Sequence, residues 1–574
     1  MQITLQLTPA SAPEHADLTE RLAAAVYRQG EAKRKAGDEV GAAADFLRVA
    51  AVAPGSKVVP TAQYDAAASL INAKQWDPAI SVLEAYRRDY PKSEYGADIT
   101  AKLAVAYVEA GRGAQAAAEF ERIAATPGED PAVAREATVR AADLYDKAGN
   151  VPRATAMLEQ LVQRYPVPVV DAIEARARLA DMAAKAGEAA RQNYWRNEII
   201  KADAGAGAGR TDRTRLLAAT ARLALAEPAR DAFRAVRLTA PLKKSLVAKK
   251  KAMETALAGY KEVVAYDVAT TTTAATYEMA ELYRTLGRDL MASERPKKLS
   301  ADEREQFDAL LEEQAYPFEE QAIAIHEVNA KRTLDGIYDD SVRRSFQALA
   351  EMSPARYAKT ELWADLLRTI APPAGTAVDP AAMTDFTRGV ANALSGKSTD
   401  AELDFKQMEL QFPALAEPSI NLGIVLQGAG HLDEAAAALQ RGTERAPGNA
   451  VAWNELGLVR RALGKFPEAK TAYEQAIAAD PGYAPAHRNL AVLLDLYLQD
   501  PKAALPEMEQ YQKLSGEDKP VNSWIAELRH RTGVKPPAPP AAPATSAGGP
   551  GATAEAPAAA PVAAPGVPSD GGSK

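Results

Sequence analysis

A repeat of 34 residues in the C-terminal part of the chain restricts the possible fold more than any other feature. Pro413, Pro447 and Pro481 stand 34 residues apart. Three further sets keep the same step: Gly389, Gly423 and Gly457; Gly396, Gly430 and Gly464; and Ala401, Ala435, Ala469 and Ala503. Small residues and prolines at fixed offsets within this period indicate paired helices that stack side by side. The sequence therefore predicts an all-α solenoid, an α-α superhelix, and favours binding over chemistry.

The clearest unit is AVAWNELGLVRRALGKFPEAKTAYEQAIAADPGY, residues 450–483. Gly457 and Ala469 leave room for two helices to approach, and Tyr473 fills the space around that contact. Pro481 ends the second helix, because proline lacks an N–H and clashes with the preceding turn. The unit resembles the tetratricopeptide repeat, although Arg460 stands where an aromatic residue is usual, and the resemblance covers residues 382–515.

The N-terminal third repeats the theme less strictly, and the middle breaks the period. Residues 23–56 place Gly30, Gly37, Ala42 and Pro54 at the offsets of the C-terminal repeat. In the middle, long amphipathic stretches predict helices at 211–235, 242–265, 271–292, 301–330 and 338–350. The predicted organisation is an N-terminal segment 1–22, repeats 23–206, an irregular helical region 207–380, repeats 382–517, a capping helix 518–534 and a tail 535–574.

Composition sets the wider limits. The net charge is −8 and the pI is near 5.5, which argues against a nucleic-acid partner. The chain has no cysteine, so disulfides and thiolate chemistry are excluded. No stretch has the apolar length of a membrane span. The Pro- and Ala-rich tail has almost no bulky side chains to bury, so we expect it to be disordered.

Two segments resemble the repeats of bacterial cell-envelope proteins. AISVLEAYRRDYPKSEYGADITAKLAVAYVEAG, residues 79–111, is similar to repeats of the outer-membrane-assembly lipoprotein BamD and the periplasmic cell-division coordinator CpoB. Residues 293–332 resemble envelope tetratricopeptide proteins, including those of gliding-motility complexes. The resemblance implies a periplasmic or envelope location. The N-terminus carries no secretory signal, so a true start at Met1 implies the cytoplasm, and the compartment stays open.

No motif in the chain predicts a reaction. ANALSGKS, residues 391–398, matches only the end of a phosphate-binding loop, lacks its first glycine and has no preceding strand. The five histidines are not spaced as metal ligands, and the acidic run at 302–320 is typical of a solvated helix face. We therefore expect no catalytic residue, no metal and no cofactor. An enzyme with an unrecognised site in 207–380, where His326 is the one histidine, is the alternative.

The resemblance implies where a partner binds. In tetratricopeptide superhelices the first helix of each hairpin lines the concave face, which here gives a predicted peptide-binding groove of Ile420, Ile424, Asn454, Leu458, Arg461 and Arg488. The amide of Asn454 suits a ligand's main chain, and the two arginines suit a carboxylate. The predicted function is thus a non-enzymatic scaffold that binds a protein or peptide, with no direct membrane span.

Overall fold

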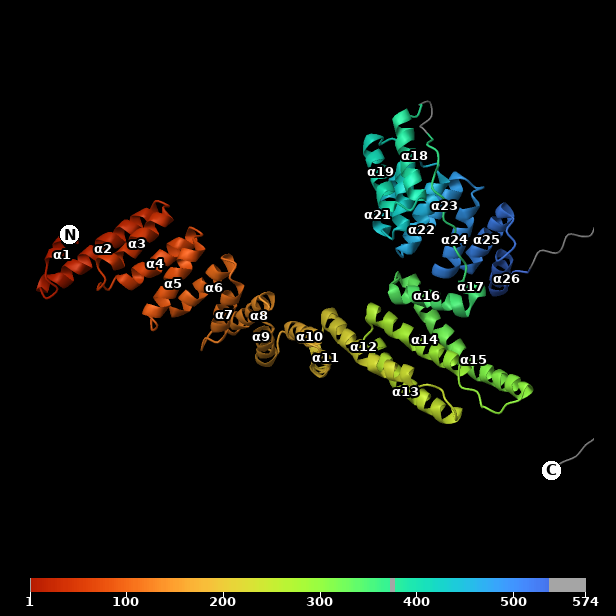
Figure 1. The fold of residues 1–574 in the computed structure, drawn as a ribbon, viewed down its shortest axis with the longest axis horizontal. Helices are drawn as coiled ribbons and strands as arrows, with labels where there is room; N and C mark the ends of the chain where they lie inside the picture. Colours follow the sequence, from red (N-terminus) through yellow and green to blue (C-terminus); the bar gives the residue numbers. More distant parts are fainter. Residues whose placement is uncertain (1, 372–376, 536–574) are drawn as a thin grey trace, which may run out of the picture.

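The computed structural model describes residues 2–371 and 377–535, and these residues form 26 α-helices, short 3₁₀ and π turns, and no strand. The all-α prediction is confirmed. Figure 1 shows an N-terminal stack of hairpins, a pair of long hairpins in the middle, and a C-terminal stack beyond them. The predicted disordered tail lies outside the described residues, except for Lys535 at its start.

Five hairpins form the N-terminal stack, after a short first helix. Their helices are α1 (Gln2–Leu7), α2 (Pro13–Lys35), α3 (Glu39–Val52), α4 (Val59–Asn72), α5 (Trp76–Asp89), α6 (Gly96–Glu109), α7 (Gly113–Ala124), α8 (Pro131–Lys147), α9 (Val151–Arg164), α10 (Val169–Lys185) and α11 (Ala189–Ala204). The tight turns inside these hairpins need left-handed backbone, which Gly37 supplies with φ +83°.

The middle region begins with four long helices, which are α12 (Asp212–Ala235), α13 (Leu242–Val264), α14 (Ala269–Met291) and α15 (Ala301–Lys331). The shorter α16 (Asp340–Met352) and α17 (Pro354–Tyr357) follow. The Gly- and Ala-rich stretch before them contains only the 3₁₀ turn η1 (Gly207–Gly209). Ile173 and Ile199 pack with Ala218 and Ala221 across this stretch, so the stack continues from α11 into α12.

The C-terminal stack contains the strict repeats. Its elements are α18 (Pro380–Leu394), α19 (Ser398–Gln411), α20 (Glu417–Gly428), α21 (Leu432–Arg445), α22 (Ala450–Ala462), α23 (Phe466–Ala479), α24 (Ala484–Val492), η3 (Leu493–Tyr497), α25 (Pro501–Ser515) and α26 (Val521–Thr532). A Cβ atom on Gly457 would lie 2.4 Å from the Tyr473 ring, which explains the glycine at this offset. Trp524, Ile525 and Leu528 of α26 cover the end of the stack, as a terminal cap requires.

One apolar core joins the middle region to the last repeat. Val342, Phe346 and Tyr357 of the middle pack with η3, α25 and α26. The rings of Phe346 and Tyr497 lie 4.9 Å apart. This junction fixes the end of α17 beside α26, and from there the chain enters the groove of the C-terminal stack.

Candidate peptide-binding groove

The groove of the C-terminal stack is occupied by a segment of the same chain. Residues 358–371, called the internal segment below, follow α17 and form neither helix nor strand. In Figure 1 this segment is the green trace that passes from α17 along the C-terminal stack toward α18. Its contacts with the repeats define what the groove is built to hold.

Three polar side chains that stand 34 residues apart hold the main chain of the internal segment. Asn489 accepts from Leu362 N at 2.7 Å and donates to Leu362 O at 2.8 Å. Asn421 does the same for Leu367, at 2.8 and 2.9 Å. Between them, Glu455 Oε1 accepts from Ala364 N at 2.8 Å. These three residues, the polar ladder, bind backbone groups, so their hydrogen bonds require an extended main chain rather than a particular side chain.

One further acceptor extends the ladder. Glu417, the first residue of α20, accepts from Ala371 N at 3.0 Å through Oε1. All four side chains are buried, and Asn421, Glu455 and Asn489 are fully so. Buried polar groups are costly without hydrogen-bond partners, and here the segment that covers these side chains also supplies those partners.

Two arginines recognise the start of the internal segment. Arg461 forms a two-point ion pair with Glu361, with Nε donating to Oε1 at 3.0 Å and a second nitrogen donating to Oε2. The Tyr473 hydroxyl donates to the same carboxylate at 3.2 Å. Arg488 donates to both the carbonyl and the hydroxyl oxygen of Thr360, each at 2.7 Å. The planar, two-point pairing of Arg461 is selective for a carboxylate, whereas Arg488 binds two neutral oxygens of the segment.

A buried lysine anchors the segment ahead of the groove. Lys359 Nζ lies 2.7 Å from Asp495 in η3 and 2.8 Å from Glu527 in α26, and its side chain is fully buried. Arg531 pairs with the same two carboxylates. The anchor therefore depends on the junction between the middle region and the last repeat.

Apolar side chains on one side of the segment complete its fit. Ile370 is 6% exposed and packs in the core with Phe386 and Phe405, and Leu366 and Leu367 pack against the same core. The opposite side faces solvent, with Trp363 49% exposed and Asp365 and Arg368 also exposed. Covered and exposed positions alternate from Leu362 to Leu366, as in a bound extended peptide, and this alternation ends at Leu367, which packs beside Leu366.

Burial perturbs the central rung of the ladder. It raises the pKa of Glu455 to about 7, although the donors Ala364 N and Asn454 Nδ2 act in the opposite direction. The second carboxyl oxygen, Oε2, is buried without a hydrogen-bond partner. The carboxyl group of Glu455 therefore changes its charge state near neutral pH.

The six residues predicted to line the groove have different surroundings. Arg461 and Arg488 contact the internal segment directly, as described above. Asn454 lies behind the ladder. It donates to Glu455 Oε1 at 3.0 Å and accepts from Asn489 Nδ2 at 2.9 Å. Its contact with the internal segment is long, with Nδ2 3.5 Å from Leu362 O. Ile420 and Leu458 are fully buried in the cores, and Ile424 is partly buried. That this groove binds a partner stays a prediction.

Sequence reasoning missed the ladder itself. Asn421, Glu455 and Asn489 each stand one residue after a position that the resemblance places in the groove. The available signal was only that three polar residues recur at the repeat step, and the preceding repeat is also polar at this offset, where it has Thr387. It also missed the internal segment, because its partners lie on other helices far along the chain.

The histidine of the alternative hypothesis is in the interior of the middle region. His326 is 0% exposed, with Nδ1 3.2 Å from Ser345 Oγ and Nε2 3.4 Å from Glu281 Oε1. Asn329 donates to the same hydroxyl at 3.1 Å. Ser345 is also fully buried, so these groups form a buried polar cluster that joins α14, α15 and α16, in which Asn329 Oδ1 has no hydrogen-bond partner.

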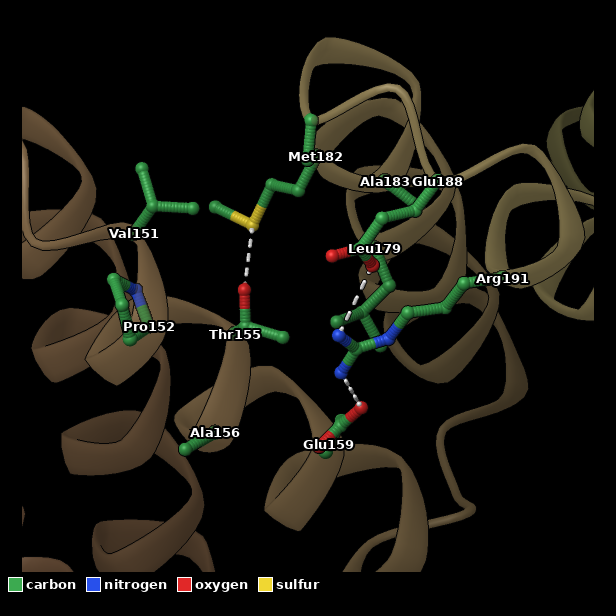
Figure 2. Close-up of a pocket in the computed structure, with 11 residues that line it drawn as sticks. Val151, Pro152, Thr155, Ala156, Glu159, Leu179, Met182, Ala183, Glu188 and Arg191 are labelled. Carbon is green, nitrogen blue, oxygen red and sulfur yellow. Dashed lines mark hydrogen bonds and ion pairs between the residues drawn. The ribbon is translucent and has the colours of Figure 1, made fainter.

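A separate cavity lies between α9, α10 and α11 (Figure 2), with a volume of about 300 Å³. Thr155 donates to the Met182 sulfur at 3.7 Å across it. Arg191 at its edge is paired with Glu159 at 2.6 Å and with Glu188 at 3.3 Å. Two carboxylates already compensate its charge, so the cavity has little attraction for an anion.

The described residues contain neither a candidate membrane span nor a candidate metal site. None of their helices combines the length and the apolar character that crossing a bilayer demands. Over the same ranges, no three histidine, aspartate or glutamate side chains gather as a metal site would.

Comparison with known proteins identifies the repeat. Residues 420–484 and 454–519 match one sequence model of the tetratricopeptide repeat, and residues 61–93 and 136–166 match another. Tetratricopeptide repeats are thus present in both the N-terminal and the C-terminal stack. No curated protein matches the chain.

Solved structures of other proteins have low overall similarity to this chain. A MamA crystal structure is 19% identical over 27% of this chain and 83% of its own, with a TM-score of 0.25. MamA 41-end from Desulfovibrio magneticus RS-1 is 20% identical over 34% of this chain and 97% of its own, with a TM-score of 0.23. Naa15/Naa10 bound to HypK-THB is 14% identical over 91% of this chain and 64% of its own, with a TM-score of 0.32. Scores this low carry no conclusion about this chain.

Proposed function

We propose that this chain is a non-enzymatic interaction scaffold whose C-terminal repeats hold an extended stretch of polypeptide. The supporting observation is the internal segment, whose main chain is held by Asn421, Glu455 and Asn489 at successive repeats. A row of side chains that binds backbone groups at the repeat step suits any extended peptide, and tetratricopeptide repeats bind protein partners. The negative net charge agrees with a protein rather than a nucleic-acid partner.

The test uses the full chain with the groove opened. Residues 361–370 are replaced by a Gly/Ser stretch of equal length, and this chain is screened against a displayed library of short peptides. We expect peptides to be enriched, and to be lost when Asn421→Ala and Asn489→Ala are added to the same chain. Circular dichroism verifies that both chains stay helical. Equal enrichment on both chains, or none on either, would contradict the proposed function.

The setting is a second part of the proposal. The similarity of residues 79–111 and 293–332 to envelope proteins supports a role in assembling a bacterial envelope structure. Fractionation of the source cells with an antibody against the chain tests it: recovery in the periplasmic or envelope fraction supports the role. Recovery only with the cytoplasmic enzymes would contradict it.

A further inference from the structure

The groove's own side chains specify what can replace the internal segment. If the segment left, Asn421, Asn489 and Glu455 would lose the main-chain partners they have while buried. Water would then take the place of each main-chain partner, and the net stabilisation of each of these hydrogen bonds would be lost. A ligand that restores all of them is another extended main chain with the same register of N–H and C=O groups.

The charge in the groove adds a second requirement. The Arg461 side chain is 16% exposed, and that of its partner Glu361 is 6% exposed. Removing one member of a buried ion pair is strongly unfavourable, because the other charge stays unpaired. An exchanging peptide must therefore bring a carboxylate to the place of Glu361, where the Tyr473 hydroxyl also donates.

Apolar contacts set the remaining positions. Leu362 packs against the core of the last repeat. The side chains of Leu366, Leu367 and Ile370 pack in the core of the first repeats of the C-terminal stack. The exposed positions are Trp363, Asp365 and Arg368. The groove therefore does not restrict which side chains a replacing peptide has at these positions. The pattern is an acidic residue followed directly by an apolar one, with further apolar residues toward the C-terminal end of the peptide.

Both ends of the segment are fixed to the same body. Lys359 is held by Asp495 and Glu527, and α18 begins at Pro380. A short tether of this kind gives a segment an effective concentration on the order of 1 mM at its site. A free peptide must overcome that concentration, so the tether weakens the apparent affinity of any external ligand.

We propose that the internal segment is a tethered competitor for this groove, and that the partner is an extended peptide with a carboxylate in the place of Glu361 and apolar side chains in the places of Leu362, Leu367 and Ile370. This rests on the proposed function, since it names the ligand and the regulation of the same groove. The scaffold is then closed until a matching peptide takes the segment's place, while the Lys359 anchor keeps the segment nearby.

The experiment measures the binding of a fluorescein-labelled peptide, TELWADLLRTIA, which is residues 360–371. The full wild-type chain is compared with a released chain carrying Glu361→Ala, Leu362→Gly and Ile370→Gly, by fluorescence anisotropy. We expect the released chain to bind the peptide about tenfold more tightly or better, because the tethered competitor is weakened. Equal affinity for both chains would overturn the inference.

A charge exchange tests the carboxylate requirement. A peptide with lysine in place of the glutamate is expected to bind the released chain about tenfold more weakly, because it faces Arg461. Arg461→Glu in the released chain is expected to restore part of the binding of that lysine peptide. An unchanged affinity of the lysine peptide for the released chain would refute the acidic position.

Two controls separate the possible failures. If both chains bind the peptide equally and Asn421→Ala with Asn489→Ala abolishes binding, the competitor idea fails and the proposed function stands. If neither chain binds it and the library screen is also empty, the proposed function fails. Should the released chain lose helicity, hydrogen exchange of residues 361–371 in the wild-type chain decides instead. Excess peptide should then raise exchange there, and no change would overturn the inference.

Discussion

At the scale of single residues, glycine positions show how closely the helices of a repeat approach. A Cβ on Gly457 would lie 2.4 Å from the Tyr473 ring, and one on Gly423 would lie 2.4 Å from Leu439. We expect Gly457→Leu to destabilise the C-terminal stack by about 1–3 kcal/mol or more, because overpacking pushes the helices apart. Gly448→Leu, where a Cβ meets nothing within 4 Å, is the matched control. Equal urea midpoints for the two variants would contradict this account.

Glu455 gives a pH-dependent prediction at the same scale. Its pKa in the folded chain is raised to about 7 from an ordinary 4.5, so ionisation opposes folding. The contribution of the neutral Glu455 carboxyl to the stability of the folded chain is complete below the ordinary pKa and is lost as the pH rises toward 7. We expect Glu455→Gln, which stays neutral, to be more stable than the wild type by about 1–3 kcal/mol at about pH 8, with a smaller gain at about pH 5.

Urea denaturation followed by circular dichroism at the two pH values checks this prediction. Glu444→Gln, at an exposed position on α21, serves as the control and is expected to change little at either pH. A Glu455→Gln gain that is larger at the lower pH would have the wrong sign for a raised pKa. It would indicate that the carboxylate is stabilised in the folded chain.

At the scale of elements, the sequence predicted the helices well and the internal segment not at all. The stretches predicted at 211–235, 242–265 and 301–330 agree closely with α12, α13 and α15. Helical periodicity and small residues at a fixed step are local signals, so they survive in a single sequence. The turn at Lys74, with φ 55°, shows a repeat whose usual glycine is absent although the hairpin forms.

The internal segment has no local signal for its extended conformation. Trp363, Leu366, Leu367 and Ile370 stand at i, i+3, i+4 and i+7, which is the spacing of an amphipathic helix. The extended conformation depends instead on hydrogen bonds between the segment's main chain and side chains 46 to 128 residues away. Asn421, Glu455 and Asn489 occupy the same position of three successive repeats. A polar residue on a helix is ordinarily exposed to solvent. Only the folded stack turns these residues toward an extended neighbour, so the ladder was not predictable from the spacing alone.

The Lys359 anchor yields a prediction for the element that it holds. Lys359→Ala removes one of the two cations that pair with Asp495 and Glu527, so Arg531 is left to compensate two buried carboxylates. Removing one member of a buried ion network is expected to cost about 3–5 kcal/mol. Lys502→Ala, at an exposed position on α25, is the control. Guanidinium denaturation of both variants measures the difference, and a Lys359→Ala midpoint equal to that of the control would show that the anchor contributes nothing.

At the scale of the whole molecule, the hydrophobic cores at the two ends of the chain share no residue. Leu22, Val26 and Phe46 belong to a core of the first repeats, while Phe346 and Tyr357 share a core with the last repeat. In a solenoid each unit contacts chiefly its neighbours, so stability is approximately a sum of local terms. Damage at one end should therefore not reach the other.

Phe346→Ala tests that independence and the role of the junction together. Loss of a buried aromatic side chain costs about 3–5 kcal/mol, and Phe346 packs against Tyr497 of η3. We expect faster hydrogen exchange in α24, α25, α26 and the internal segment, with α2 to α7 unchanged. Phe46→Ala, which removes a fully buried ring from α3, is the matched control and should give the reverse pattern. If either variant accelerated exchange along the whole chain, the molecule would unfold as one unit, and the junction would not be what holds the internal segment in its groove.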